Sequence, residues 1–239
     1  MRRIVMALAL LLSLVGGVAS AAEAVDLELV LLADASRSID DGEIRFQRRG
    51  YAAALTHPHV LRAIANGFLR RIAVTYLEWG DVESQEVVVP WTIIDGPESA
   101  AAFAAKLLDE PRRAFGPNAI GNALAAAHRL IESNAIEGSR RVIDFSGDSA
   151  YNFGGISILE ARGAALAADI VINGLAILCR VCSGRPVSYD LEAAFADLIV
   201  GGPGSFVVTA DGDRSFAAAV RRKLVLEIAL GPQAYALNR

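Results

Sequence analysis

Short apolar runs alternate along the chain with longer segments in which apolar residues recur every three or four positions. The runs, bounded by Gly, Asp and Ser, are typical of buried strands, and the longer segments are typical of amphipathic helices. Six strands are predicted, at residues 26–33, 71–79, 86–94, 141–145, 170–178 and 205–209. Six helices are predicted, the first from Asp40 to a break at His57-Pro58 and the others at residues 97–108, 120–131, 157–168, 191–199 and 214–229.

This alternation predicts an α/β fold: a doubly wound, mostly parallel six-stranded sheet with helices on both faces. The strands at 71–79 and 86–94 are joined by a short turn at Gly80-Asp81. The second of them is therefore predicted to be an antiparallel edge strand. Neither a repeat nor an interdomain linker interrupts the pattern, so we expect one domain over residues 25–230 and a C-terminal tail over residues 231–239.

The first residues predict export. Arg2 and Arg3 precede an apolar run from Ile4 to Val15, and the small residues Ala19-Ser20-Ala21 follow. This order matches a signal peptide over residues 1–21, because the apolar run is shorter than the roughly 20 residues that a transmembrane anchor needs. We therefore expect a periplasmic or secreted protein without a transmembrane segment after cleavage.

The chain has two cysteines, Cys179 and Cys182. Thiols outside the cytoplasm tend to be oxidised, so a short local disulfide is the first interpretation. Two free thiols or a redox-active C-x-x-C pair are the alternatives, although no helix begins after the pair to lower a thiol pKa.

Composition narrows the class of protein. With 54% hydrophobic and 21% charged residues, the chain has the composition of a well-packed globular protein. The formal net charge of −4 argues against nucleic acid as a partner, because binding phosphates requires a basic surface.

One group of polar residues follows the first strand directly. Asp34, Ser36 and Ser38 occupy alternate positions, and in an extended or loosely turned segment such residues point the same way. Their oxygens are the ligands that hard divalent cations prefer. Asp148 ends the strand at 141–145, and if the two strands are adjacent it lies beside Asp34.

The sequence D-x-S-x-S after the first strand, a later G-x-A-L helix and the Asp after the next strand resemble the metal-ion-dependent adhesion site, MIDAS, of von Willebrand factor type A domains. The resemblance covers roughly Val25–Leu230. The segments RRVIDFSGDSAYN, INGLAI and IVGGPGSFV resemble, more narrowly, an exported bacterial branch of that superfamily whose function is uncharacterised.

By this resemblance Asp34, Ser36 and Ser38 match the first metal-binding loop and Asp148 the third. The second loop departs from the pattern, because Asn118 stands where family members usually have Thr. An Asn carbonyl oxygen still binds hard cations.

The resemblance implies a divalent cation, Mg²⁺ first and Mn²⁺ or Ca²⁺ as alternatives, with a coordination position open to a carboxylate. The implied partner is a protein or an envelope ligand that presents an acidic group. Nothing in this recognition needs bond-making chemistry, so a binding module is favoured over an enzyme.

Other interpretations remain. Ser38 or Asp40 could cap the following helix, and the same fold could serve as a structural or interaction domain that no longer binds metal. A Mg²⁺-dependent phosphatase would use Asp34 as nucleophile, yet Ser36 stands where such enzymes usually have a second acid. A serine hydrolase built on Gly147-Asp148-Ser149 would need a histidine near the C-terminus, and all three histidines precede residue 149.

Three further acids have structural interpretations. Glu78 and Asp81 are expected to belong to a solvated hairpin turn, although they could border the site. Asp144 lies in an apolar strand, and Arg140 and Arg141 are its expected partners.

Overall fold

The computed structural model describes residues 22–178, 189–211 and 213–229. The predicted signal peptide, Cys179, Cys182 and the predicted C-terminal tail lie outside the described residues, so these predictions stay untested.

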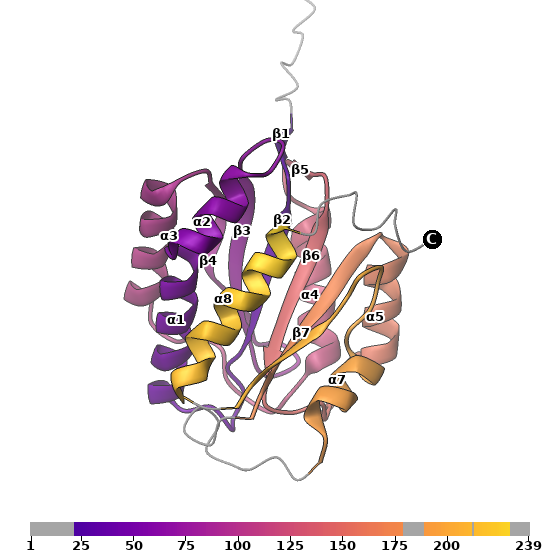
Figure 1. Ribbon diagram of the computed structural model, residues 1–239. Coiled ribbons are helices and arrows are strands. Elements are labelled where there is room, and N and C mark those ends of the chain that lie inside the picture. Colours follow the sequence, from indigo (N-terminus) through magenta and orange to yellow (C-terminus); the bar gives the residue numbers. More distant parts are fainter. Residues whose placement is uncertain (1–21, 179–188, 212, 230–239) are drawn as a thin grey trace, which may run out of the picture.

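A six-stranded sheet forms the centre of the fold, in the order β4-β3-β2-β6-β7-β8 (Figure 1). Only the β3–β4 pair is antiparallel, which places the antiparallel strand at an edge. The predicted fold class is therefore confirmed. The strands are β2 (Glu28–Asp34), β3 (Ile72–Trp79), β4 (Gln85–Ile94), β6 (Arg141–Gly147), β7 (Ile170–Ile177) and β8 (Val207–Ala210).

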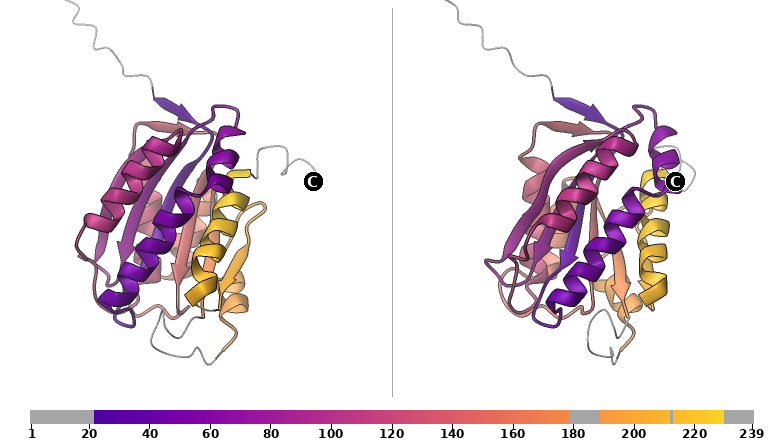
Figure 2. Two further views of the ribbon diagram at one scale, coloured as in Figure 1. Left: turned by 60° about the vertical axis from the view of Figure 1, so that its left-hand side comes forward. Right: turned by 90° about the vertical axis from the view of Figure 1, so that its left-hand side faces the viewer.

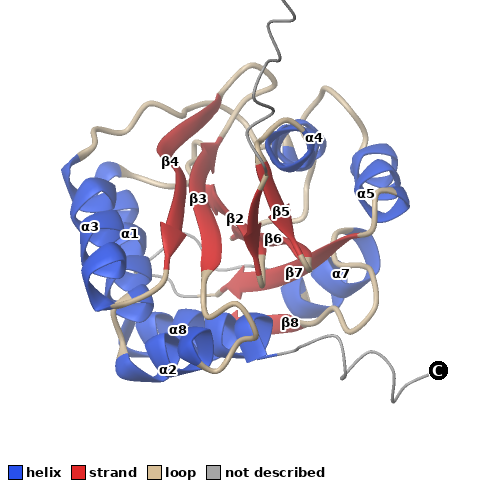
Figure 3. Cartoon of the chain, turned by 90° about the horizontal axis from the view of Figure 1, so that it is seen from above, coloured by secondary structure: helices blue, strands red, loops and turns tan. Residues whose placement is uncertain are grey.

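Helices cover both faces of this sheet (Figure 3). One face carries α1 (Asp41–Leu55), α2 (Pro58–Ala65), α3 (Pro97–Asp109) and α8 (Asp213–Ala229), and the other carries α4 (Ile120–Glu132), α5 (Ile158–Ala167) and α7 (Leu191–Leu198). Figure 2 shows α1 between α3 and α8. Successive β2 residues alternate between two cores, because side chains of a strand point to opposite faces: Leu29 and Leu31 pack in one core, Val30 and Leu32 in the other.

The pattern analysis missed three short elements. Helical structure resumes at Pro58 as α2, because proline is tolerated in the first turn of a helix, and His57 caps α2 by accepting the His59 backbone N–H at its Nδ1. Strands β1 (Glu23–Val25) and β5 (Ile136–Gly138) form a separate parallel pair, away from the carboxyl ends of the sheet strands (Figure 1).

The order of the sheet reverses between β2 and β6. The helix after β2, α1, lies on one face, and the helix after β6, α5, lies on the other. Where crossovers leave to opposite faces, the carboxyl ends of the strands form the crevice in which α/β proteins bind ligands. Asp34 ends β2 and Asp148 follows β6, so both acids lie at this crevice.

Candidate metal-binding site

The first loop begins with a buried carboxylate. Asp34 is 0% exposed, and its Oδ1 accepts the backbone N–H of Ser36 at 2.8 Å. This bond closes a tight turn in which the hydroxyls of Ser36 and Ser38 lie 3.3 Å apart. The structure therefore places the three oxygen-bearing side chains of the D-x-S-x-S motif together.

The helix after this loop uses neither serine as its cap. Asp40 is the N-cap of α1 and forms a reciprocal pair of hydrogen bonds with Glu43: the Glu43 backbone N–H donates to Asp40 Oδ1, and the Asp40 backbone N–H donates to Glu43 Oε2. Of the two caps considered from the sequence, Asp40 is correct and Ser38 is wrong. The Ser36 and Ser38 hydroxyls therefore serve no capping role.

The end of β6 packs directly against Asp34. The Asp148 backbone N–H lies 3.5 Å from Asp34 Oδ2, and a Cβ on Gly147 would lie only 3.2 Å from the same oxygen. A glycine at this position thus lets the Asp34 carboxylate approach the third loop. Asp148 is itself 9% exposed, so two acids that are far apart in the chain share one nearly buried crevice.

The electrostatics of the crevice disfavour two bare carboxylates. Burial raises the pKa of Asp34 to about 8, and the negative charge of Asp148 contributes in the same direction. Burial also raises the pKa of Glu43, and the charges of Asp40 and Asp148 raise it further. In the described part of the chain Asp34 itself forms no ion pair with Lys, Arg or His.

Asn118 lies on the second loop, which is tied to the other two through the backbone. The Arg37 N–H donates to the Gly116 carbonyl at 2.8 Å, and the Phe153 N–H donates to the Asn118 carbonyl at 2.6 Å. Asn118 is 7% exposed. The backbone thus holds the three loops together at one edge of the sheet, with the Asn118 side chain largely enclosed among them.

The approach of these loops requires glycine at two positions. A Cβ on Gly121, the second residue of α4, would overlap the carbonyl oxygen of Ile156, and a Cβ on Gly80 would overlap the backbone of Phe115. The Gly121 N–H donates to Asn152 Oδ1 at 3.1 Å, which joins the second and third loops. Both glycines serve the close packing of loops.

An arginine supports the first loop. The Arg112 guanidinium donates to the Ala35 carbonyl at 2.7 Å and to the Ser36 carbonyl at 3.3 Å, and it pairs with Asp41 at 3.1 Å. The sequence analysis did not single out Arg112. No short-range pattern could have identified it, because its partners are far from it in the chain.

The structure changes the interpretation of two acids near the site. Glu78 is not in a solvated turn: it is fully buried in β3 and forms a two-point ion pair with Arg48 of α1, with nitrogen–oxygen distances of 2.8 and 3.0 Å. Asp144 forms an ion pair with Lys223 of α8 at 2.7 Å, a partner that the sequence analysis did not name. In both cases the partner comes from a helix packed on the sheet, because a charge buried between sheet and helix is costly unless an opposite charge lies beside it.

The donor set is poor in carboxylates. Among the described residues, no three His, Cys, Asp or Glu side chains are arranged as metal ligands. The predicted set contains two carboxylates, Asp34 and Asp148, and its other donors are the hydroxyls of Ser36 and Ser38 and the amide oxygen of Asn118. Such a set suits a hard cation that keeps part of its water shell.

Solved structures share this fold at low sequence identity. The proximal thread matrix protein 1 of the mussel byssus, in a structure with a zinc-occupied MIDAS motif, has a TM-score of 0.61 and 15% identity over 87% of this chain and 49% of that one. The vWF domain of the type V pili tip protein Mfa5 from Porphyromonas gingivalis has a TM-score of 0.56 and 8% identity, over 84% and 94% of the two chains. The pilus adhesin SpaC from Lactobacillus rhamnosus GG has a TM-score of 0.57 and 11% identity, over 86% and 31%.

These identities show the fold alone, and this chain spans about half the length of the byssus protein. The fold is that of a von Willebrand factor A-like domain. The chain belongs to the family DUF1194, described as a protein of unknown function, whose model matches residues 24–231. No curated protein matches the sequence.

Proposed function

We propose that this protein is an exported binding module, which recognises an acidic group of a partner through a divalent cation held at the carboxyl ends of β2 and β6. The proposed ligands are the oxygens of Asp34, Ser36, Ser38, Asn118 and Asp148. The observation that carries the proposal is the fully buried Asp34 carboxylate, packed against the Asp148 loop without a cationic partner in the described residues.

The residues of this crevice fit a hard cation. All proposed donors are oxygens, and the two serine hydroxyls face one another instead of capping a helix. Mg²⁺ suits this donor set best, with Mn²⁺ and Ca²⁺ as alternatives. When bound, the cation would neutralise the two carboxylates and offer a coordination position to a carboxylate of the partner. The chain's own role is to hold the oxygens in place.

The surface around the crevice suits a macromolecular partner. Phe115 of the second loop is 52% exposed, and Tyr151 and Phe153 of the third loop are 59% and 61% exposed. Aromatic side chains are enriched in binding surfaces, where a few of them often carry much of the binding energy. We infer that the partner is a protein or an envelope ligand whose carboxylate is flanked by apolar surface, and not a nucleic acid.

The arrangement of residues argues against the enzymatic alternatives. Lys223 is buried in contact with Asp144 and therefore does not bind a phosphoryl group at Asp34, as a phosphatase would require. His57 and His59 follow the far end of α1, which has 15 residues and so spans roughly 22 Å from the crevice. They are too distant to act as a base for Ser149.

The proposal includes export of the protein from the cytoplasm. The signal peptide predicted over residues 1–21 favours a periplasmic or secreted protein, and in that location an adhesion-type module would meet envelope ligands. In the described residues, every helix is too short or too polar to cross a bilayer.

Thermal unfolding tests the metal step. Mg²⁺, Mn²⁺ or Ca²⁺ at about 100 times its dissociation constant should stabilise the protein by about 2.7 kcal/mol relative to EDTA, a shift of several degrees in Tm. Asp34→Ala and Ser36→Ala should abolish this shift. Asp197→Ala, at an exposed position of α7, is the matched control and should retain it. If no cation shifts the wild-type midpoint, the metal-free structural domain becomes the better account.

Acetate serves as a probe of whether the bound cation recognises an acidic group. With saturating Mg²⁺, acetate should raise Tm further, whereas acetamide, which has the same shape without the charge, should not. An equal effect of acetate in EDTA would contradict recognition through the cation.

A further inference from the structure

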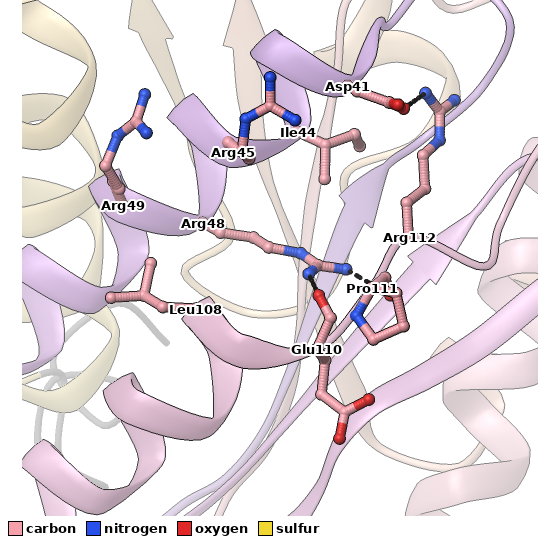
Figure 4. A pocket seen from close by; sticks show the side chains of 9 residues that line it. All are labelled: Asp41, Ile44, Arg45, Arg48, Arg49, Leu108, Glu110, Pro111 and Arg112. Carbon is pink, nitrogen blue, oxygen red and sulfur yellow. Dashed lines mark hydrogen bonds and ion pairs between the residues drawn. The ribbon is translucent and has the colours of Figure 1, made fainter.

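A second recess lies on the α1 side of the sheet, between α1 and the segment that follows α3 (Figure 4). Its volume is about 410 Å³, and four of the nine residues that line it are arginines. They are Arg45, Arg48, Arg49 and Arg112. The chain as a whole has a formal net charge of −4, so this recess is more basic than the average surface of the protein.

Two of the four positive charges are neutralised by acids. Arg48 is buried, pairs with Glu78, and also donates to the carbonyls of Glu110 and Pro111. Arg112 pairs with Asp41 at 3.1 Å. These two side chains therefore form the rigid wall of the recess and add little net charge.

The acid at the rim does not neutralise the remaining arginines. The Glu110 carboxylate pairs with Arg113 at 2.7 Å, and Figure 4 shows it pointing away from Arg45 and Arg49. The Glu110 carboxylate is therefore paired with Arg113 and does not compensate the charges of Arg45 and Arg49.

Arg45 and Arg49 supply the excess charge. Both are exposed, and in the described part of the chain neither has a hydrogen bond or ion pair through its guanidinium. They are four residues apart on α1, about 6 Å along the helix axis, so they lie on the same face. Like charges at this spacing repel one another, and an anion between them would relieve the repulsion.

We propose that this recess binds the phosphate group of a small soluble phosphate ester. Arg45 and Arg49 bind the phosphate oxygens through their guanidinium groups, a geometry that favours bidentate bonds. The apolar side chains of Ile44, Leu108 and Pro111 line the same recess and contact the organic part of the ligand.

Phosphate fits this recess better than a carboxylate does. A carboxylate presents two oxygens in one plane and can satisfy one guanidinium, whereas a phosphate monoester presents three oxygens and close to two negative charges. Two uncompensated arginines carry two positive charges, which match the charge of one phosphate, and their N–H groups can donate to all three of its oxygens.

Isothermal titration calorimetry with phenyl phosphate and inorganic phosphate tests the proposal. The full chain is used in EDTA, so that the result does not depend on the proposed cation site. Phenyl phosphate should bind the wild type more tightly than inorganic phosphate does, because its ring adds apolar contact. Arg45→Gln/Arg49→Gln should weaken phenyl phosphate binding by about tenfold or more.

The matched control is Arg62→Gln/Arg129→Gln, which removes two exposed arginines from α2 and α4. It changes the net charge equally and should leave the affinity as in the wild type. The proposal is overturned if phenyl phosphate does not bind, if the control variant weakens binding as much, or if benzoate binds as tightly as phenyl phosphate. Unchanged far-UV circular dichroism and Tm show that both variants are folded.

Discussion

The most informative substitution is Asp34→Asn in the absence of metal. It keeps the shape of the side chain and an oxygen for the Ser36 N–H, but removes the charge that burial and Asp148 disfavour. In the metal-free wild type this carboxyl lowers the stability at neutral pH, because the folded state must hold a proton that the unfolded chain releases. The neutral variant should therefore be more stable than the wild type in EDTA, although it removes a proposed metal ligand.

The size of this stabilisation follows from the raised pKa of Asp34. This pKa is about 8 in the folded protein, against 3.8 for an unperturbed Asp. Between these values the folded state holds the proton that the unfolded chain releases, so the stability of the wild type falls as pH rises from about 4 to 8. By this linkage the cost is on the order of 4 kcal/mol at pH 7. Allowing for the weakened contact with the Asp148 N–H, we expect Asp34→Asn to stabilise the metal-free protein by about 2–3 kcal/mol.

Urea unfolding in EDTA at several pH values measures this difference. The gain of Asp34→Asn over the wild type should be near zero at pH 4 and should grow up to pH 8, and Asp197→Asn should show no such trend. With Mg²⁺ at about 1,000 times its dissociation constant the order should reverse, because only the wild type gains the binding energy, which is then about 4.1 kcal/mol. A variant that is less stable than the wild type in EDTA at every pH would refute the reasoning.

Other predictions concern packing and buried charge. Gly121→Ala should lower stability by about 1–3 kcal/mol in urea unfolding, because its Cβ overlaps the Ile156 carbonyl, and should reduce the Mg²⁺-dependent shift in Tm; Gly163→Ala, at an open position of α5, should be neutral or slightly stabilising. Equal effects of the two substitutions would contradict the close approach of the loops. Lys223→Met should lower the free energy of unfolding by about 3–5 kcal/mol in the same assay, because the buried carboxylates of Asp144 and Glu227 both lose their ion pair with Lys223. A loss below about 1 kcal/mol would show that this ion pair is not a structural requirement.

The sheet and the location of the crevice could be predicted because both depend on local patterns. Apolar runs gave the strands, and the short turn at Gly80-Asp81 gave the antiparallel edge. Asp34 and Asp148 could be placed at one edge because residues that follow parallel strands share that edge. A resemblance to one family then supplied the remaining candidate, Asn118, which backbone hydrogen bonds between the loops hold in the same region.

Pairings between distant charged residues could not be predicted. The Arg48–Glu78 and Lys223–Asp144 pairs each join a helix to a strand, and the register of helix against sheet is set by packing of the whole core. Arg112 was missed for the same reason. The helix after Pro58 was missed because proline can either end a helix or begin one, and the sequence around it does not distinguish the two.

Direct titration with Mn²⁺, followed by electron paramagnetic resonance, tests the central claim most directly. The account predicts that the wild type and Asp197→Ala bind a single Mn²⁺ that Mg²⁺ displaces, and that Asp34→Ala and Ser36→Ala lose this binding. The account is contradicted if the wild type binds no Mn²⁺, or if Asp34→Ala binds it as tightly as the wild type does.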